Sequence, residues 1–156
     1  MSKVKFLNTR ERKELFLQLK EQFDFQADLD FLFFEASDNK IFLLSKDYAN
    51  IDLTGLRVNN QGMYFGKREH DGFRLSIEGS QLIQAKKNII LLTKSQAESW
   101  MKGEDIQLDG DSGYVIVQQD KDILGCGNLR NNVLRNMVPK ERRLHSITNN
   151  DEESFE

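Results

Sequence analysis

Short apolar segments separated by turn residues run through this sequence, and they limit its possible folds more than any other feature. Residues 29–35 and 41–44 flank a turn, which is typical of a β-hairpin. Residues 63–67 and 73–77 flank a second turn at 70–72. No apolar run is long enough to cross a bilayer. The pattern therefore excludes a membrane protein and predicts a largely antiparallel sheet.

One amphipathic helix is predicted before these strands. Asn8 is followed three residues later by Glu11, which is the spacing of a capping box. Apolar residues then recur at helical spacing, and the opposite face is charged. They are Leu15, Phe16, Leu19 and Phe23. We expect this helix to pack its apolar face on the sheet.

The second half of the chain predicts a small β-barrel. Residues 88–93 have the composition of a strand, and Ser95 is a candidate N-cap for a short helix over 96–101. Residues 114–118 and 123–128 form a predicted hairpin whose glycines stand at bulge positions. The fold class is therefore α+β, with an α/β first half and a barrel in the second half. We place the two domains at 1–84 and 85–147.

Composition indicates a cytoplasmic protein. The chain has 156 residues, a net charge of −3 and 38% hydrophobic residues, enough to build a core without disulfides. Its one cysteine, Cys126, has no partner for an internal disulfide. The N-terminus shows no apolar signal segment.

Charge is distributed unevenly near the C-terminus. Residues 121–143 hold six basic and two acidic side chains, and residues 151–156 hold four acids and no base. Local asymmetry of this kind favours a phosphate-binding surface. We expect residues 148–156 to be an acidic disordered tail that shields the basic segment from RNA.

Catalytic and cofactor motifs are not evident. Gly125-Cys126-Gly127 resembles the start of a dinucleotide fingerprint, but Arg130 stands where the last glycine is needed. Residues 109–113 resemble the start of a calcium loop, but Tyr114 stands where that loop needs glycine and Asp120 where it needs glutamate. Cys126 has no base near it in sequence, so we expect a buried structural thiol. The sequence predicts no enzyme, no metal site and no cofactor.

Several motifs in the second half resemble a PUA domain (pseudouridine synthase and archaeosine transglycosylase). They are a helix ending in Gly103, a strand beginning at Gly113, and residues 122–127 with their paired glycines. Residues 136–143 carry an Asn, a Pro-Lys pair and a following Arg. That ending is similar to the PUA-like tail of Sun-type RNA cytosine methyltransferases.

The first half resembles the pre-PUA domain of the Nip-seven ribosome-biogenesis factors. The matching pieces are the early Glu-rich helix and residues 44–46, 65–67 and 73–75. The resemblance as a whole covers residues 10–144. It implies that the first domain contacts proteins or the other domain.

The resemblance implies a non-catalytic RNA-binding protein of ribosomal RNA maturation. Its partners would be RNA, either rRNA or tRNA, and proteins of ribosome assembly or RNA modification. One alternative is an accessory module for an RNA cytosine methyltransferase. Others are a protein-interaction adaptor with an acidic tail and a small enzyme with its site between the halves.

The candidate RNA-binding residues combine the basic segment with two lysines near the short helix. Arginine and lysine neutralise phosphate, and four or five such contacts predict a slope of roughly −3 to −4 for log affinity against log salt. The candidates are Lys94, Lys102, Arg130, Arg135, Lys140, Arg142 and Arg143. Gly103 is added from the resemblance as a point where the backbone approaches RNA. Arg142 and Arg143 follow Pro139, so we expect them exposed at the barrel edge and replaceable without unfolding.

Overall fold

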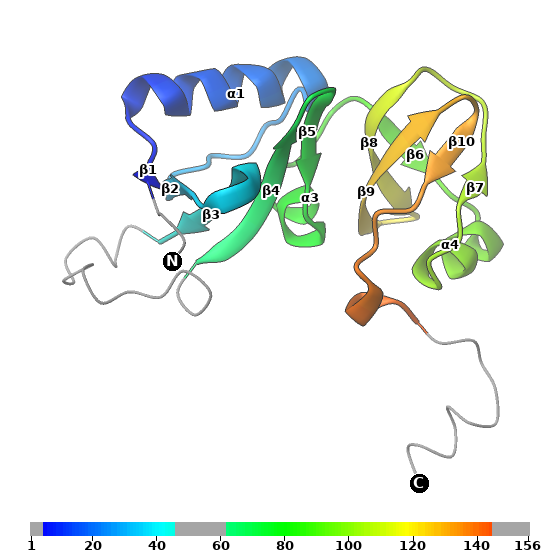
Figure 1. The fold of residues 1–156 in the computed structure, drawn as a ribbon. Helices are drawn as coiled ribbons and strands as arrows, with labels where there is room; N and C mark the ends of the chain where they lie inside the picture. Colours follow the sequence, from blue (N-terminus) through cyan, green and yellow to red (C-terminus); the bar gives the residue numbers. More distant parts are fainter. Residues whose placement is uncertain (1–4, 46–61, 145–156) are drawn as a thin grey trace, which may run out of the picture.

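Two five-stranded sheets lie side by side in the computed structural model, which describes residues 5–45 and 62–144 (Figure 1). The first sheet has the order β1-β2-β3-β4-β5, and the second has the order β6-β8-β9-β10-β7. The strands of the first sheet are β1 Lys5–Phe6, β2 Leu32–Glu35, β3 Lys40–Leu44, β4 Met63–Glu69 and β5 Gly72–Leu75. Those of the second are β6 Ile89–Leu91, β7 Ile106–Gln107, β8 Gly113–Gln119, β9 Asp122–Arg130 and β10 Val133–Arg135.

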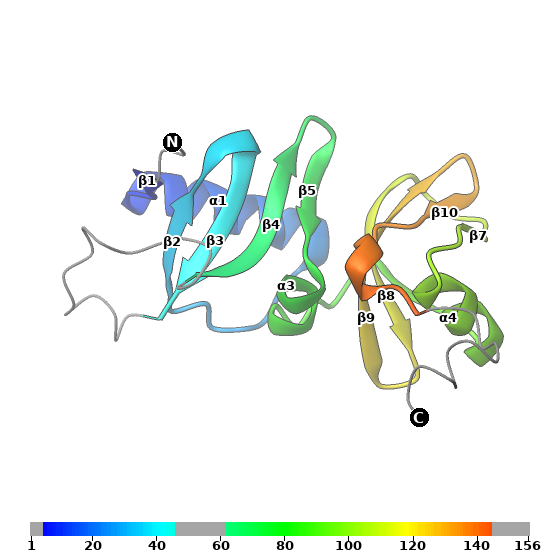
Figure 2. The same cartoon turned by 60° about the horizontal axis from the view of Figure 1, so that its bottom comes forward.

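The helical segments lie outside the sheets. The α-helices are α1 Thr9–Phe23, α3 Ile77–Leu82 and α4 Lys94–Met101, and the 3-10 turns are η1 Ser37–Asn39 and η4 Lys140–Arg142. Helix α1 covers one face of the first sheet, and α4 lies at the far side of the second (Figure 1). The face of the first sheet opposite α1 lies on the same side of the molecule as α3 and η4 (Figure 2).

Helix α1 begins as the sequence predicts. The Asn8 side chain accepts a hydrogen bond from the Glu11 amide, and the Glu11 carboxylate accepts one from the Asn8 amide. These bonds satisfy two donors that the first helical turn leaves free. Leu15, Leu19 and Phe23 are fully buried against the sheet, which confirms the predicted apolar face.

The first sheet is antiparallel throughout its described strands. Both predicted hairpins are present, as β2–β3 and β4–β5. The second of them is shorter than expected because Ser76 caps a helix: its hydroxyl accepts from the Gly79 amide, so Ile77 begins α3 instead of ending a strand.

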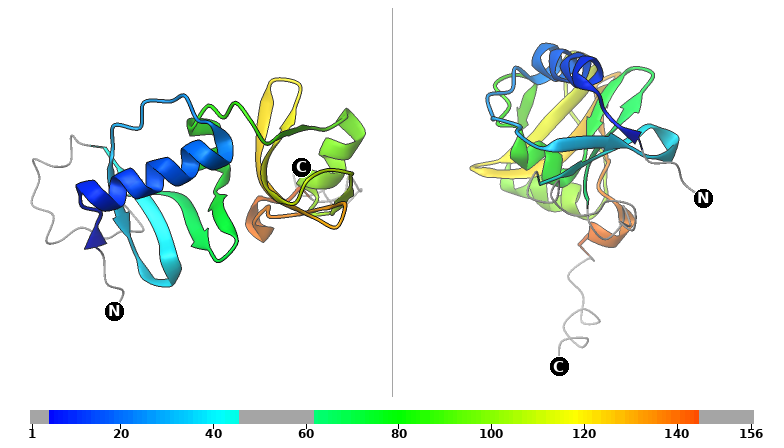
Figure 3. Two further views of the ribbon diagram at one scale, coloured as in Figure 1. Left: turned by 90° about the horizontal axis from the view of Figure 1, so that it is seen from above. Right: turned by 90° about the vertical axis from the view of Figure 1, so that its left-hand side faces the viewer.

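The second sheet is mixed and curls into a half-barrel (Figure 3, left), which confirms the predicted α+β class with a PUA-like second half. Strand β6 runs parallel to β8, and the other pairs are antiparallel. The β8–β9 ladder contains a bulge, since Val117 pairs with Gly125 while Gln118 pairs with Ile123. Gly125 has φ +137°, and a Cβ there would lie 3.1 Å from Ile77 Cγ1. Glycine therefore permits both the bulge and the close approach of α3.

The N-cap of α4 differs from the prediction. Thr93 caps the helix in place of Ser95, because the Thr93 hydroxyl accepts from the Gln96 amide while the Gln96 side chain accepts from the Thr93 amide. The sequence offers two candidate capping boxes, Thr93 with Gln96 and Ser95 with Glu98, and the structure forms the first.

Some expectations concern residues that the structure does not describe. For residues 45–54 the sequence predicts a short helix or turn, and all of them except Ser45 lie outside the described residues. For residues 56–58 it predicts an extended segment, which lies wholly outside them. The same holds for the acidic tail at 148–156. Within the described ranges, no helix is both long and apolar enough to span a membrane.

Strand β8 joins the two sheets through both of its faces. Tyr114 and Ile116 belong to the hydrophobic cluster of α1 and the first sheet, which also takes in Cys126. Val115 and Val117 belong to the cluster that fills the half-barrel. Because side chains alternate along a strand, one strand contributes to two cores.

Polar contacts centred on Asp71 reinforce this junction. Asp71 lies in the turn between β4 and β5, and its carboxylate accepts a hydrogen bond of 2.9 Å from the Tyr114 hydroxyl. It also pairs with the Arg130 guanidinium. Burial alone would raise the pKa of Asp71, but hydrogen bonds from Tyr114 and Arg130 outweigh burial, and the pKa is lowered. The ionised carboxylate is therefore the form that the fold favours.

We predict that Asp71→Asn lowers the free energy of unfolding at pH 7 by about 1–2 kcal/mol, since the partly exposed Arg130 loses its ionic partner. A lowered pKa gives stability that is present above the ordinary carboxyl pKa of about 3.9 and is lost as the pH falls below it. The difference between wild type and variant should therefore shrink between pH 7 and pH 3 in urea denaturation. An equal difference at both pH values would contradict this role for the charge.

Candidate nucleic-acid interface

The C-terminal end of α4 is tied to the segment that follows β10. The Asn136 side-chain amide donates to the carbonyls of Trp100 (2.8 Å) and Glu104 (2.9 Å). The Leu144 amide donates to the Met101 carbonyl at 2.7 Å. The bond to Met101 satisfies a carbonyl that the last helical turn leaves free, and the bonds to Trp100 and Glu104 hold Asn136 against the end of the helix. They place the predicted basic segment beside the helix end that carries Lys102 and Gly103.

Gly103 and Arg143 are in direct contact. Gly103 has φ +96°, and a Cβ there would lie 2.6 Å from both Cδ and Nε of Arg143. The Arg143 Nε–H donates to the Val138 carbonyl at 3.0 Å, and its side chain is only partly exposed. Arg143 is therefore less exposed than the sequence predicts, because it packs on the backbone of Gly103, and its replacement without unfolding stays a prediction.

Four of the predicted residues are exposed cations without an ionic partner in the described part of the chain: Lys94, Lys102, Arg135 and Lys140. Lys102 is the C-cap of α4, and Arg135 directly precedes Asn136, whose backbone amide donates to Asp105. Lys140 lies in η4, where its carbonyl accepts from the Arg143 amide. We call Lys102, Arg135 and Lys140 the cation cluster. Positive side chains near a helix C-terminus are also favoured by its dipole.

Two predicted arginines are engaged across the junction of the sheets instead. Arg130 pairs with Asp71, and Arg142 pairs with Glu78 of α3 at 2.8 Å. Arg142 is exposed, as expected, but its partner lies on α3 of the first half. Both guanidiniums already have a carboxylate, so they are less available to phosphate than the cation cluster.

Lys94 stands apart from the other candidates. It is exposed at the first position of α4, whereas Lys102 follows the last, which separates them by roughly 12 Å along the helix at 1.5 Å per residue. The structure therefore places Lys94 at the opposite end of α4 from Lys102.

The asparagines of the basic segment have structural roles that the predictions above did not include. Asn131 and Asn132 both have positive φ between the paired residues Arg130 and Val133, so they form a two-residue hairpin turn. Asn136 uses its side-chain oxygen to accept from the Val138 amide and its nitrogen for two carbonyls. The Asn-Asn pair between two apolar runs is the signal that predicts the turn.

Cys126 is buried, as predicted, at 4% exposure. Desolvation raises the pKa of its thiol to about 12, so the thiolate is scarce near neutral pH. In the described ranges, His, Cys, Asp and Glu side chains nowhere gather in threes that could hold a metal ion.

A curled half-barrel with a glycine-ended helix packed beside it defines a PUA-like domain. The family model described as "Methyltransferase RsmF PUA domain" matches residues 87–144, which confirms the resemblance to the tail of Sun-type methyltransferases. Residues 87–144 are therefore similar to the PUA domain of RsmF-type methyltransferases. The resemblance of the first half to Nip-seven factors and the domain boundaries at 84 and 147 remain predictions.

Two curated relatives carry the name ribosomal RNA small subunit methyltransferase F and come from two strains of Vibrio cholerae serotype O1. Each is 25% identical over 108 residues, which is 67% of this chain and 23% of the relative. The chain thus spans about a quarter of the length of the relatives that it matches. The aligned 108 residues are more than the chain contains from residue 87, where the family match begins, to its end. The alignment with the relatives therefore extends into the first half.

We predict that Gly103→Ala lowers the free energy of unfolding by about 1–2 kcal/mol, since alanine is strained at positive φ. Combining it with Arg143→Ala removes the steric contact and leaves only the backbone strain. The two effects should then be non-additive by about 0.5 kcal/mol or more in a double-mutant cycle of chemical denaturation. Strict additivity would show that Arg143 does not cover Gly103 in solution.

Proposed function

We propose that this chain binds ribosomal RNA through its PUA-like domain and that the cation cluster supplies phosphate contacts. The observation that carries this proposal is the match of residues 87–144 to the RsmF PUA domain. The cation cluster supports it, because its three exposed side chains have no ionic partner in the described part of the chain. Unpaired exposed cations bind phosphate without first breaking an ion pair.

The setting that we propose is rRNA modification. The curated relatives are named as methyltransferases of small-subunit ribosomal RNA, and the match to them favours an accessory role in rRNA methylation over a general role in ribosome assembly. Proteins of rRNA modification would be its partners. A cytoplasmic location, which the sequence predicts, belongs to the same proposal.

We further propose that this chain does not itself catalyse methyl transfer. Cys126 is the one cysteine of the sequence, and burial keeps its thiol protonated. A thiol nucleophile needs an accessible thiolate and a neighbouring base. Contacts to RNA from the cation cluster require neither.

We predict that replacing Lys102, Arg135 and Lys140 together with alanine weakens binding of single-stranded and structured rRNA fragments. Each neutralised phosphate contributes about −0.7 to the single-strand salt slope, so the wild-type slope of roughly −3 to −4 should fall in magnitude by about 2. Filter binding between 50 and 200 mM salt measures both the affinity and the slope.

A matched control removes the same types of charge elsewhere. Arg10, Lys13 and Lys86 are exposed, and two of them lie on α1. Their triple alanine variant has the same net charge as the test variant and should retain wild-type affinity. If the two variants lose the same affinity, RNA binding depends only on the net charge of the protein, and the proposal of a localised interface is refuted. An absence of RNA binding by the wild-type chain would favour the adaptor alternative.

We also predict that this chain does not bind S-adenosylmethionine. No cofactor-binding loop is recognisable in the sequence of residues 87–144. Calorimetry at micromolar protein should therefore show no heat of S-adenosylmethionine binding. Stoichiometric binding would instead support an enzyme with a site between the two halves.

A further inference from the structure

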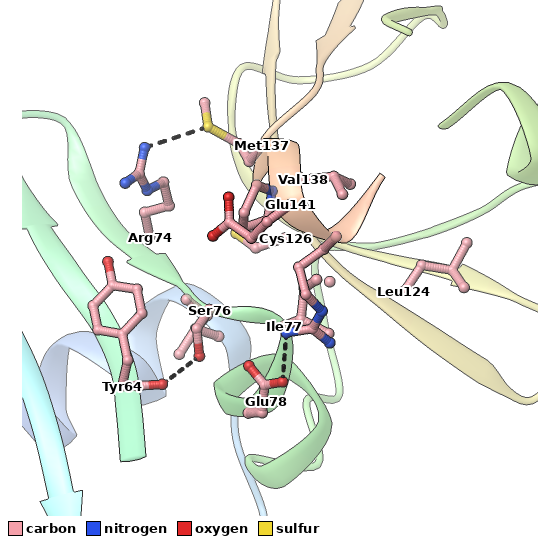
Figure 4. A pocket seen from close by; sticks show the side chains of 14 residues that line it. Tyr64, Arg74, Ser76, Ile77, Glu78, Leu124, Cys126, Met137, Val138 and Glu141 are labelled. Atoms are coloured by element: carbon pink, nitrogen blue, oxygen red, sulfur yellow. Dashed lines mark hydrogen bonds and ion pairs between the residues drawn. The ribbon is translucent and has the colours of Figure 1, made fainter. Parts of the chain in front are cut away.

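A cavity of about 420 Å³ lies between the two sheets (Figure 4). One wall comes from β4, β5 and the start of α3, and the other comes from β9 and residues 137–142. Its volume falls within the roughly 300–1,000 Å³ typical of small-ligand sites. Of the candidate RNA-binding residues, only Arg142 lines it.

Arg74 lines this cavity, and several N–H donors of its guanidinium have no acceptor among the described residues. Its Nη1 forms an ion pair with the Glu69 carboxylate at 3.5 Å, which is longer than the 2.8 Å between Arg142 and Glu78, and lies 3.6 Å from the Met137 sulfur. Sulfur is a weak acceptor, and a guanidinium has five N–H donors. Several Arg74 donors therefore remain without a protein acceptor among the described residues. A planar guanidinium in this state suits the two oxygens of a phosphate group.

Tyr64 places an aromatic ring on the same wall. It is the last of a row of rings in which Phe34 stacks on Phe42 and Phe42 contacts Tyr64, each pair 5.5 Å apart between centroids. Phe42 thus restricts the orientation of the Tyr64 ring. Figure 4 shows Tyr64 and Arg74 together, facing Met137 and Glu141 across the cavity. Unpaired RNA bases bind proteins by stacking on such rings.

Carboxylates on the cavity wall favour a nucleotide over a simple anion. Glu141 is exposed and has no ionic partner in the described part of the chain, and Glu78 is paired with Arg142. Carboxylate oxygens repel a phosphate ion but accept hydrogen bonds from the amino groups of bases. A ligand with both a phosphate and a base can use Arg74, Tyr64 and Glu141 together.

The cavity is continuous with the interface already described. Lys140 of the cation cluster lies in η4, and its neighbours Pro139 and Glu141 line the cavity. η4 lies on the same side of the molecule as the face of the first sheet that carries Tyr64 (Figure 2). An RNA strand held by Lys140 therefore has a short path into the cavity.

We propose that this cavity receives one unpaired nucleotide of the bound RNA, with its base against Tyr64 and its phosphate on Arg74. This inference rests on the proposed function, because RNA must first bind to the chain. It adds a base-contacting site, contributed largely by the first half, to the phosphate contacts of the PUA-like domain.

The test uses the whole chain and single-stranded oligouridine RNAs that each carry one 2-aminopurine, whose fluorescence is quenched by stacking. We expect quenching at one position with wild type and with Tyr64→Phe, and its loss with Tyr64→Ala. Affinity should fall about fivefold or more with Tyr64→Ala, in line with the loss of one stacked base. Arg74→Met should weaken binding about tenfold.

Arg68→Met is the matched control. Arg68 lies on the adjacent strand β4, is 30% exposed against 32% for Arg74, and pairs with a carboxylate 3.5 Å away. It does not line the cavity, so this variant should bind like wild type. Thermal melting confirms that each variant is folded, and Arg74→Met tests the site independently if Tyr64→Ala unfolds.

Two results would overturn the proposal in different ways. If wild type binds RNA but Arg74→Met and Arg68→Met have equal affinity, the cavity is not occupied and the proposed function stands. The same conclusion follows if the 2-aminopurine at one position is still quenched when the RNA is bound to the folded Tyr64→Ala variant. If the wild-type chain binds none of the RNAs, the cavity proposal and the proposed function fail together.

Discussion

The burial of β8 on both faces is the constraint on which the rest of the structure depends. A strand with no solvent face needs a hydrophobic partner on each side, and here Tyr114 and Ile116 meet the first sheet while Val115 and Val117 fill the half-barrel. The two sheets therefore pack against each other through a shared hydrophobic cluster. Gly125 allows α3 to approach β9 closely at the same junction.

Ion pairs follow from this packing and divide the basic residues by role. Once the sheets are docked, Arg130 meets Asp71 and Arg142 meets Glu78, so two arginines of the PUA-like half bind carboxylates of the other half. Among the described residues, the members of the cation cluster form no such ion pair. A charge count along the chain cannot separate the paired arginines from the cation cluster, because the carboxylates that pair with Arg130 and Arg142 lie about sixty residues away in sequence.

The junction also explains why the first half matters to a proposed RNA site. The PUA-like match covers residues 87–144, but the cavity beside η4 takes its aromatic ring and its guanidinium from β4 and β5. The alignment with the curated relatives extends beyond the PUA-like part as well. RNA recognition proposed for one sheet thus gains a base-contacting wall from the other.

The sequence by itself determined the local elements: the capping box at Asn8, both hairpins of the first sheet, the bulge at Gly125 and the burial of Cys126. The capping box, the hairpins and the bulge depend on residues only a few positions apart, so spacing and turn chemistry suffice, while Cys126 was expected to be buried because its sequence neighbours are apolar or glycine. Tertiary structure alone decided which arginines are paired, that Arg143 covers Gly103, and that Tyr64 and Arg74 face residues 137–142 across a cavity. These features join distant segments, and their partners become defined only when the two faces of β8 have been covered.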